Sequence, residues 1–121
     1  MAEECIFCKI IKGEVPCHKV YEDADYLAFL SIAPEAPGHA LIIPKGHYRW
    51  VWDMPNAGKA FEVVQKIALA QKKAFDTDFI ISKVIGEDVP HAHFHVYPGS
   101  SVKGEKKDTA LNAEKIRKEL K

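Results

Sequence analysis

The sequence lacks any long apolar run and any net charge. No stretch of its 121 residues approaches the about 20 consecutive apolar residues that a membrane-spanning helix needs. Seventeen basic residues balance seventeen acidic ones, so no overall field attracts nucleic acid or an anionic membrane, and any phosphate ligand must be held by local groups. The first ten residues carry no basic segment followed by an apolar run, which favours a cytoplasmic protein.

Cysteine is also scarce. Cys5, Cys8 and Cys17 are an odd number, and a disulfide framework is not expected in a reducing compartment. Cys5 and Cys8 form a Cys-x-x-Cys pair, which on its own is compatible with a redox pair, metal ligands or packed thiols. With 47% hydrophobic residues, a chain of this length buries one modest core, so we expect a single domain.

The sequence predicts both helices and short strands. Helical spacing of apolar residues predicts one main helix over 56–75, with shorter helical segments at 5–11 and after Asp108. β-Branched and aromatic residues predict strands, the first two joined as a hairpin, at 19–21, 26–32, 40–43, 79–85 and 92–97. The sum is an α+β fold with an antiparallel sheet of about five strands, one main helix and short terminal helices.

The segment 91–98 carries the pattern that points most directly to chemistry. In a strand, successive side chains point to opposite faces, so His91, His93 and His95 would share one face. The residues between them are apolar and would pack into the core, which holds the imidazoles on a rigid element. Three imidazoles at this spacing favour a catalytic cluster over isolated packed histidines, and they leave a metal site as the alternative.

The run His-Ala-His-Phe-His-Val-Tyr resembles the His-x-His-x-His-x-x signature, x being apolar, of the histidine-triad (HIT) nucleotide-binding family. The resemblance covers roughly the first 98 residues, including Cys5–Ile11 and Pro37–Lys45, and it points to bacterial-type members with a zinc-site Cys-x-x-Cys. It implies a HIT domain at 1–98, followed by a polar connection and helical tail at 99–121. It also implies a symmetric homodimer formed through the main helix and an edge strand.

The same resemblance implies an enzyme that cleaves nucleoside phosphoramidates or related nucleotidyl esters through a covalent nucleotidyl-histidine intermediate. His93 would be the nucleophile, His95 would contact the phosphoryl group and help protonate the leaving group, and His39 would support them. Besides His93 and His95, the implied nucleotide-binding residues are Phe7, Ile10, Ser31, Ile32, Gly86 and Val89. A noncatalytic purine nucleotide sensor and a zinc-stabilised interaction module are the alternative functions.

The resemblance further implies a structural zinc ion held by Cys5, Cys8, His47 and His91. Two thiolates and two imidazoles complete a tetrahedral site with no open position. The ion would tie the N-terminal turn to the histidine segment, and it would leave the other two histidines of that segment free for chemistry.

Two places depart from the family pattern. Relatives commonly carry an aspartate where this chain has Ser31, and a serine makes fewer and uncharged contacts to ribose hydroxyls. Glu87 and Asp88 stand where relatives often have glutamine and serine or threonine, and two carboxylates repel a nearby phosphate. We therefore expect weak nucleotide affinity, or a leaving group that carries a positive charge.

Overall fold

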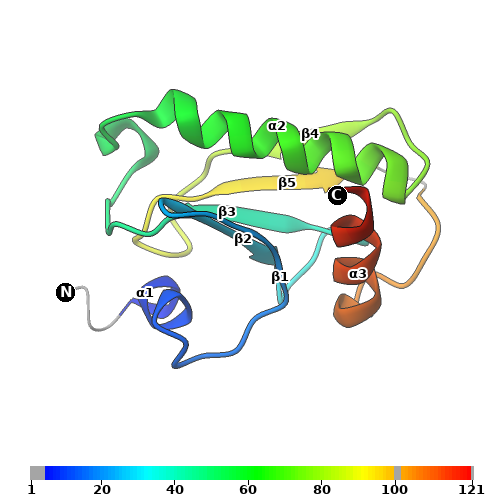
Figure 1. Cartoon of the computed structure of the whole chain (residues 1–121), viewed down its shortest axis with the longest axis horizontal. Helices are drawn as coiled ribbons and strands as arrows, with labels where there is room; N and C mark the ends of the chain where they lie inside the picture. The colour runs from blue at the N-terminus through cyan, green and yellow to red at the C-terminus, as the bar shows by residue number, and fades with distance from the viewer. Residues whose placement is uncertain (1–4, 100–101, 121) are drawn as a thin grey trace.

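The computed structural model describes residues 5–99 and 102–120. Its elements, in chain order, are α1 (Ile6–Ile11), β1 (Lys19–Glu22), β2 (Tyr26–Leu30), β3 (Ala40–Pro44), the 3₁₀ helix η2 (Val51–Asp53), α2 (Ala57–Ala74), β4 (Ile80–Lys83), β5 (Phe94–Pro98) and α3 (Thr109–Glu119). The strands form one antiparallel sheet in the order β1-β2-β3-β5-β4. Figure 1 shows α2 lying across one face of this sheet, α1 on the other side, and α3 near one end of α2. The predicted α+β fold with a five-stranded antiparallel sheet is confirmed.

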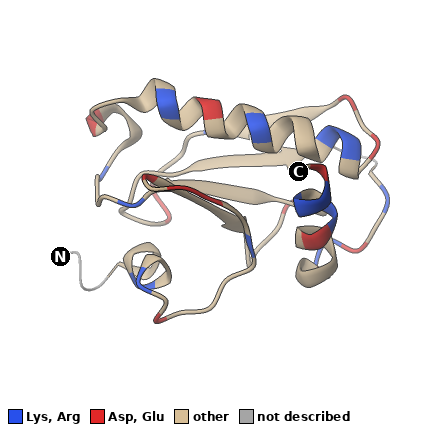
Figure 2. Cartoon of the chain, in the orientation of Figure 1, with Lys and Arg blue, Asp and Glu red and all other residues tan. Residues whose placement is uncertain are grey.

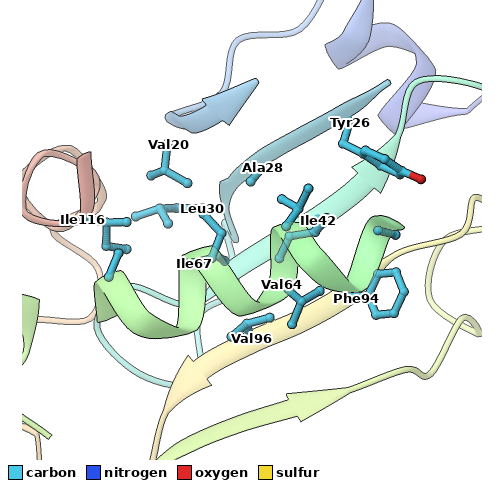
Figure 3. Close-up of a cluster of buried hydrophobic side chains, with 14 of the residues drawn as sticks. Val20, Tyr26, Ala28, Leu30, Ile42, Val64, Ile67, Phe94, Val96 and Ile116 are labelled. Carbon is cyan, nitrogen blue, oxygen red and sulfur yellow. The ribbon is translucent and has the colours of Figure 1, made fainter. Parts of the chain in front are cut away.

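The main core lies between α2 and the sheet. Val64 and Ile67 project from α2 toward the strands and pack in one cluster with Ile42 of β3 (Figure 3). The next residue of β3, Ile43, is buried in a second cluster on the other face, together with Phe7 of α1. Strands β2 and β3 are therefore buried on both faces, which is why each reads as a continuous apolar run and not as an alternating one.

Strand β5 has one apolar face and one polar face. Phe94 and Val96 pack beneath α2 (Figure 3), so His95 between them points to the opposite side of the sheet. The strand begins at Phe94 and not at Ala92 as predicted, because the Ala92 N–H donates to the Tyr48 carbonyl at 2.6 Å. Ala92 still belongs to the main core cluster, so the alternation of side chains that the sequence predicted continues ahead of the strand.

Two other strands are shorter than predicted. Strand β4 ends at Lys83, where its pairing with β5 ends, and the chain then leaves the sheet for the loop 84–90. Strand β2 ends at Leu30, the last of its residues in register with β3, although the next N–H, that of Ser31, still donates to the His39 carbonyl at 2.9 Å. The chain then turns, and the Ala33 N–H donates to the Ser31 hydroxyl at 3.1 Å. Both corrections concern residues that turn away from the sheet toward the polar face of β5.

Helix α3 packs on α2 and β1. Its N-cap is Asp108, as the sequence predicted, and the Asp108 carboxylate accepts the Leu111 N–H at 3.3 Å. Ile116 of this helix is fully buried in the main core cluster. The predicted connection and tail at 99–121 include residues 100–101 and 121, which lie outside the described residues.

Charges of both signs are mixed over the surface. Figure 2 shows basic and acidic positions interspersed along α2 and α3, in keeping with the formal net charge of zero. Among the helices that the structure describes, none combines the length and the apolar character needed to cross a membrane.

Candidate active site and metal centre

Three imidazoles meet on the face of the sheet opposite α2. The ring centroids of His93 and His95 are 5.0 Å apart, and those of His39 and His95 are 5.2 Å apart. His39 directly precedes β3, which pairs with β5 in an antiparallel register. The structure thus brings together the three residues that were predicted to be catalytic.

The hydrogen on His93 is positioned by the backbone. His93 Nδ1 lies 2.7 Å from the carbonyl oxygen of His91, and because a carbonyl can only accept, Nδ1 carries the hydrogen. In the neutral ring, Nε2 is then the basic nitrogen. The ring of Phe7 meets His93 edge-on with centroids 5.2 Å apart, which further limits rotation of the imidazole.

Two further hydrogen bonds orient His39 and His95. The Glu35 N–H donates to His39 Nδ1 at 3.0 Å, so a neutral His39 carries its hydrogen on Nε2 and donates it to His95 Nδ1, also at 3.0 Å. Burial, then the positive charges of His95 and Lys83, lower the pKa of His39 to about 4, so the ring is neutral near pH 7. Burial, then the charge of His93, also lowers the pKa of His95. His95 therefore presents an Nε2–H, and this buried atom has no hydrogen-bond partner among the described residues.

Gln71 of α2 holds the two strands that carry this histidine pair. Its side chain is fully buried, and its Nε2 donates to the carbonyls of Gly38 and Val96, both at 2.9 Å. Gly38 directly precedes His39, and Val96 directly follows His95. Gly38 has a φ of +79°, and a Cβ there would overlap the ring of Phe75, so no larger residue fits without movement.

Two pockets meet beside these imidazoles. One is mainly apolar and about 450 Å³ in volume, within the range of about 300–1,000 Å³ typical of small-molecule sites. Its lining includes Phe7, Ile10, Phe29, Ile32, Leu41 and Val89. The other is polar, and its lining includes Glu35, His39, Lys83, Glu87 and Tyr97. Ser31, Ala33, Asp88 and His95 line both pockets and mark their junction.

The loop 84–90 places a carboxylate at this junction. Asp88 Oδ1 lies 3.1 Å from His93 Nε2, and Asp88 Oδ2 lies 3.9 Å from His95 Nε2. Burial works to raise the pKa of Asp88, but the positive charge of His93 and local backbone N–H groups outweigh it and lower the pKa. Asp88 is thus an ionised carboxylate at neutral pH, and while it lies this close to His93, Nε2 carries a hydrogen that the carboxylate accepts. Nε2 offers its electron pair only after Asp88 has turned away and this hydrogen has left.

Arg49 and Trp50 hold the start of this loop. Arg49 Nη1 donates to the Gly86 carbonyl at 2.8 Å, and the guanidinium lies 3.7 Å from the centroid of the Trp50 ring. Gly86 has a φ of +87°, and a Cβ there would overlap the Trp50 ring. Gly86 therefore lies beneath Trp50 and lines neither of the two pockets, whereas Val89 lines the apolar one. His93 is buried and also lines neither pocket, but its Nε2 lies next to Asp88 at their junction.

Cys5, Cys8, His47 and His91 form a separate cluster, and their ligand atoms all lie within 4.8 Å of one another. His91 Nδ1 is 3.3 Å from the Cys5 sulfur, and His47 Nδ1 is 3.2 Å from the Cys8 sulfur. Zinc bonds of about 2.3 Å to sulfur and about 2.0 Å to nitrogen, at tetrahedral angles, place these atoms about 3.5 Å apart. The four predicted ligands are therefore close to the spacing that a tetrahedral ion requires.

The protonation of this cluster also suits a cation. His91 Nε2–H donates to the Pro44 carbonyl at 2.9 Å, which leaves Nδ1 with a free electron pair facing the thiols. Burial, then a hydrogen bond with Cys5 and the charge of its thiolate, raise the pKa of Cys8 to about 11. A positive ion between the two sulfurs would reverse this effect and allow both thiols to ionise.

Besides pocket-lining residues such as Phe29 and Tyr97, two residues that position or contact the histidines, Asp88 and Gln71, were not among the predicted site residues. Asp88 was noted as a departure from the family pattern, but its contact with His93 depends on the path of the loop. Gln71 carried a usable signal, because it lies four residues after Ile67 and seven after Val64 and so interrupts the apolar stripe of α2. A polar residue on such a stripe needs a buried partner, and here it has two.

The fold and the three imidazoles beside a two-part pocket define an α+β protein with a histidine-based site. The chain belongs to the HIT domain family, whose model matches residues 12–102. An uncharacterized HIT-like protein of Methanocaldococcus jannaschii is 40% identical over 97% of this chain and 98% of its own. Adenosine 5'-monophosphoramidase HNT1 of Saccharomyces cerevisiae is 42% identical over 78% of this chain and 61% of its own.

A solved structure agrees with this assignment. The zinc-bound histidine triad family protein of Mycobacterium smegmatis superposes with a TM-score of 0.85 at 29% identity, covering 99% of this chain and 95% of that one. The family that the histidine motif predicted is confirmed.

Proposed function

We propose that the protein hydrolyses nucleoside phosphoramidates or related nucleotidyl esters, with His93 as the nucleophile. The observation that carries this proposal is the hydrogen bond from His93 Nδ1–H to the His91 carbonyl, because it leaves Nε2 as the basic nitrogen beside the pocket junction. The name of the yeast relative, a monophosphoramidase, supports the same class of reaction.

The reaction would proceed in two displacements. His93 Nε2 attacks the phosphorus while the bond to the leaving nitrogen or oxygen breaks, and His95 Nε2–H gives its proton to the leaving group. Water then attacks the nucleotidyl-histidine and returns a proton to His95, which releases the nucleoside monophosphate and restores His93. His39 stays bonded to His95 Nδ1 and keeps the His95 ring directed at the phosphorus.

Each of the two pockets would bind a different part of the substrate. The base enters the apolar pocket against Phe7, Ile10 and Ile32, and Ile32 suits this role because the residue is 99% exposed and is not part of the core. The leaving group extends into the polar pocket. Ser31 and Val89 flank the sugar and the phosphoryl group, whereas Gly86 acts by fixing the loop.

We infer that the four-residue cluster of Cys5, Cys8, His47 and His91 holds a structural zinc ion. The donor set is the tetrahedral one that zinc favours, and the mycobacterial relative was solved with zinc bound. The ion would join α1 to the segment that carries the nucleophile.

The homodimer stays a prediction. The exposed Phe61 and Leu69 of α2 and the edge strand β4 are the surfaces that it would cover, and the molecular mass in solution tests it.

Intact-protein mass spectrometry tests the reaction. The wild type, quenched briefly without acid during turnover of a fluorogenic adenosine phosphoramidate, should carry a transient adenylyl adduct, and His93→Ala should carry none and release no product. Retained zinc and an unchanged circular dichroism spectrum would show that the variant is folded. Saturable binding of the substrate without adduct or product would contradict the proposal and favour the nucleotide sensor.

A further inference from the structure

Asp88 stands in front of the nucleophile. Its Oδ1 is 3.1 Å from His93 Nε2, the His93 side chain has no exposed surface, and the Asp88 side chain is 54% exposed. A phosphorus atom must come within about 3–3.5 Å of the attacking nitrogen for a bond to form. The Asp88 oxygen already occupies that position, so a phosphoryl group reaches His93 only after this carboxylate has rotated away.

The Asp88 carboxylate occupies the place that a phosphoryl group would take. Its two oxygens face the Nε2 atoms of His93 and His95, the two atoms that would contact a phosphoryl group in the proposed reaction. Asp88 also lines both pockets at their junction, where a phosphoryl group must sit if a nucleotide spans them. The resting site thus holds an internal anion.

Rotation of the side chain leaves the charge of Asp88 close by. The loop is anchored on one side by Arg49, which binds the Gly86 carbonyl at 2.8 Å. It is anchored on the other side by the His91 N–H, which donates to the Val89 carbonyl at 2.8 Å. With the backbone held before and after Asp88, its carboxylate can turn only toward one of the two pockets. A bound phosphoryl group therefore stays within a few ångströms of a negative charge.

We propose that Asp88 is a specificity-determining residue that makes this site select ligands by the charge on phosphorus. The inference rests on the proposed function. A nucleoside phosphoramidate carries one negative charge on phosphorus, whereas the monophosphate product carries close to two above its second pKa of about 6. Because Coulomb repulsion scales with the product of the charges, Asp88 weakens binding of the product more than binding of the substrate. The consequence is easier release of the monophosphate.

Calorimetric binding of AMP and adenosine at pH 8 to the full chain with its native metal tests the proposal. Relative to the wild type, Asp88→Asn should bind AMP about tenfold more tightly, a change of about 1.4 kcal/mol. Adenosine lacks the phosphate, so its affinity should change less than twofold. Asp88→Ser should behave like Asp88→Asn. Glu119→Gln removes the same charge at the exposed end of α3, where the residue lines neither pocket, and should change AMP affinity less than threefold.

Turnover supplies a second readout. In Asp88→Asn, the inhibition constant of AMP should fall about tenfold, and the KM of an uncharged-amine adenosine phosphoramidate should fall no more than about threefold. The inference is overturned if AMP affinity is unchanged or weaker in Asp88→Asn, if adenosine tightens equally, if Glu119→Gln has the same effect, or if no variant binds AMP. A protein that binds AMP as expected but forms no adduct would refute the proposed hydrolysis and leave the role of Asp88 standing.

Discussion

His91 and His93 are two residues apart, and the backbone holds them by opposite nitrogens. His91 donates its Nε2–H to the Pro44 carbonyl and turns Nδ1 toward the thiols, whereas His93 donates its Nδ1–H to the His91 carbonyl and keeps Nε2 for the pocket junction. Identical side chains thus present the electron pairs of different ring nitrogens to different neighbours. The role of each of these two imidazoles is therefore set by the carbonyl that it meets and not by the residue type.

The metal cluster around His91 and the catalytic site around His93 also differ in where their other residues come from. In the metal cluster, Cys5 and Cys8 at the start of α1 and His47 after β3 complete the set around His91. Both cysteines also belong to or pack against the second apolar cluster. The site of His93 is completed by Asp88, which is half-exposed on a loop. The metal cluster is therefore expected to govern stability, and the catalytic site to govern turnover and ligand choice.

Removing one metal ligand should have the largest effect on the stability of the protein. Cys8→Ser should lose bound zinc and at least about 3 kcal/mol of the free energy of unfolding, because the binding energy of a structural zinc is part of the folding energy. For a chain of this size the melting temperature should fall by about 10 °C or more. Elemental analysis and denaturant unfolding measure both effects. Cys17→Ser, which changes a cysteine outside the cluster, should keep its zinc, and full zinc content in Cys8→Ser would contradict the assignment.

Acid should destabilise the fold through His39, which belongs to the catalytic site. Its folded pKa of about 4 lies below the ordinary 6.5, so below pH 6.5 the unfolded chain takes up a proton that the folded protein refuses. The free energy of unfolding should therefore fall by up to about 3 kcal/mol between pH 7 and pH 4 from this residue alone. Denaturant unfolding of the wild type and His39→Gln across this range checks it, because the variant lacks this contribution. Parallel pH curves for the two proteins would refute the prediction.

Loss of the Gln71 amide should have the smallest effect on the free energy of unfolding, and it should also slow turnover. Gln71→Leu leaves the Gly38 and Val96 carbonyls without their donor, which should cost about 1–2 kcal/mol of unfolding free energy. Because these carbonyls adjoin His39 and His95, kcat should also fall about tenfold with little change in KM. Gln65→Leu, on the exposed face of the same helix, is the matched control. Equal kinetics in the two variants would confine Gln71 to a purely structural role.

Most of the fold could be predicted from the sequence because its signals are local. The helical spacing of apolar residues places α2 within one residue of its observed ends, and Asp108 caps α3 as expected. The errors lie at Ile32, Ala92 and Ile85, where the predicted strands run too far. Each residue has strand-forming character, but the Ala92 N–H donates to Tyr48 outside the sheet, and Ile32 and Ile85 lie beyond the last paired residues of β2 and β4. Where a strand stops pairing depends on tertiary contacts.

The candidate site divides in the same way. The histidines and the Cys-x-x-Cys pair stand out because their spacing is fixed by strand and helix periodicity, and the structure brings them together. The contact of Asp88 with His93 and the position of Gly86 beneath Trp50 depend on the path of an irregular loop. No periodicity in the sequence encodes that path, so these two features had to come from the structure.

The group that selects the tautomer of His93 is a peptide carbonyl, that of His91. A side-chain acceptor in that place would be lost by a single base change in the gene, whereas every amino acid at position 91 brings a carbonyl of its own. The orientation of the nucleophile is thereby protected from mutation at the very residue that provides it. Only a change in the path of the chain, such as an insertion or a deletion between Pro90 and Phe94, can abolish it.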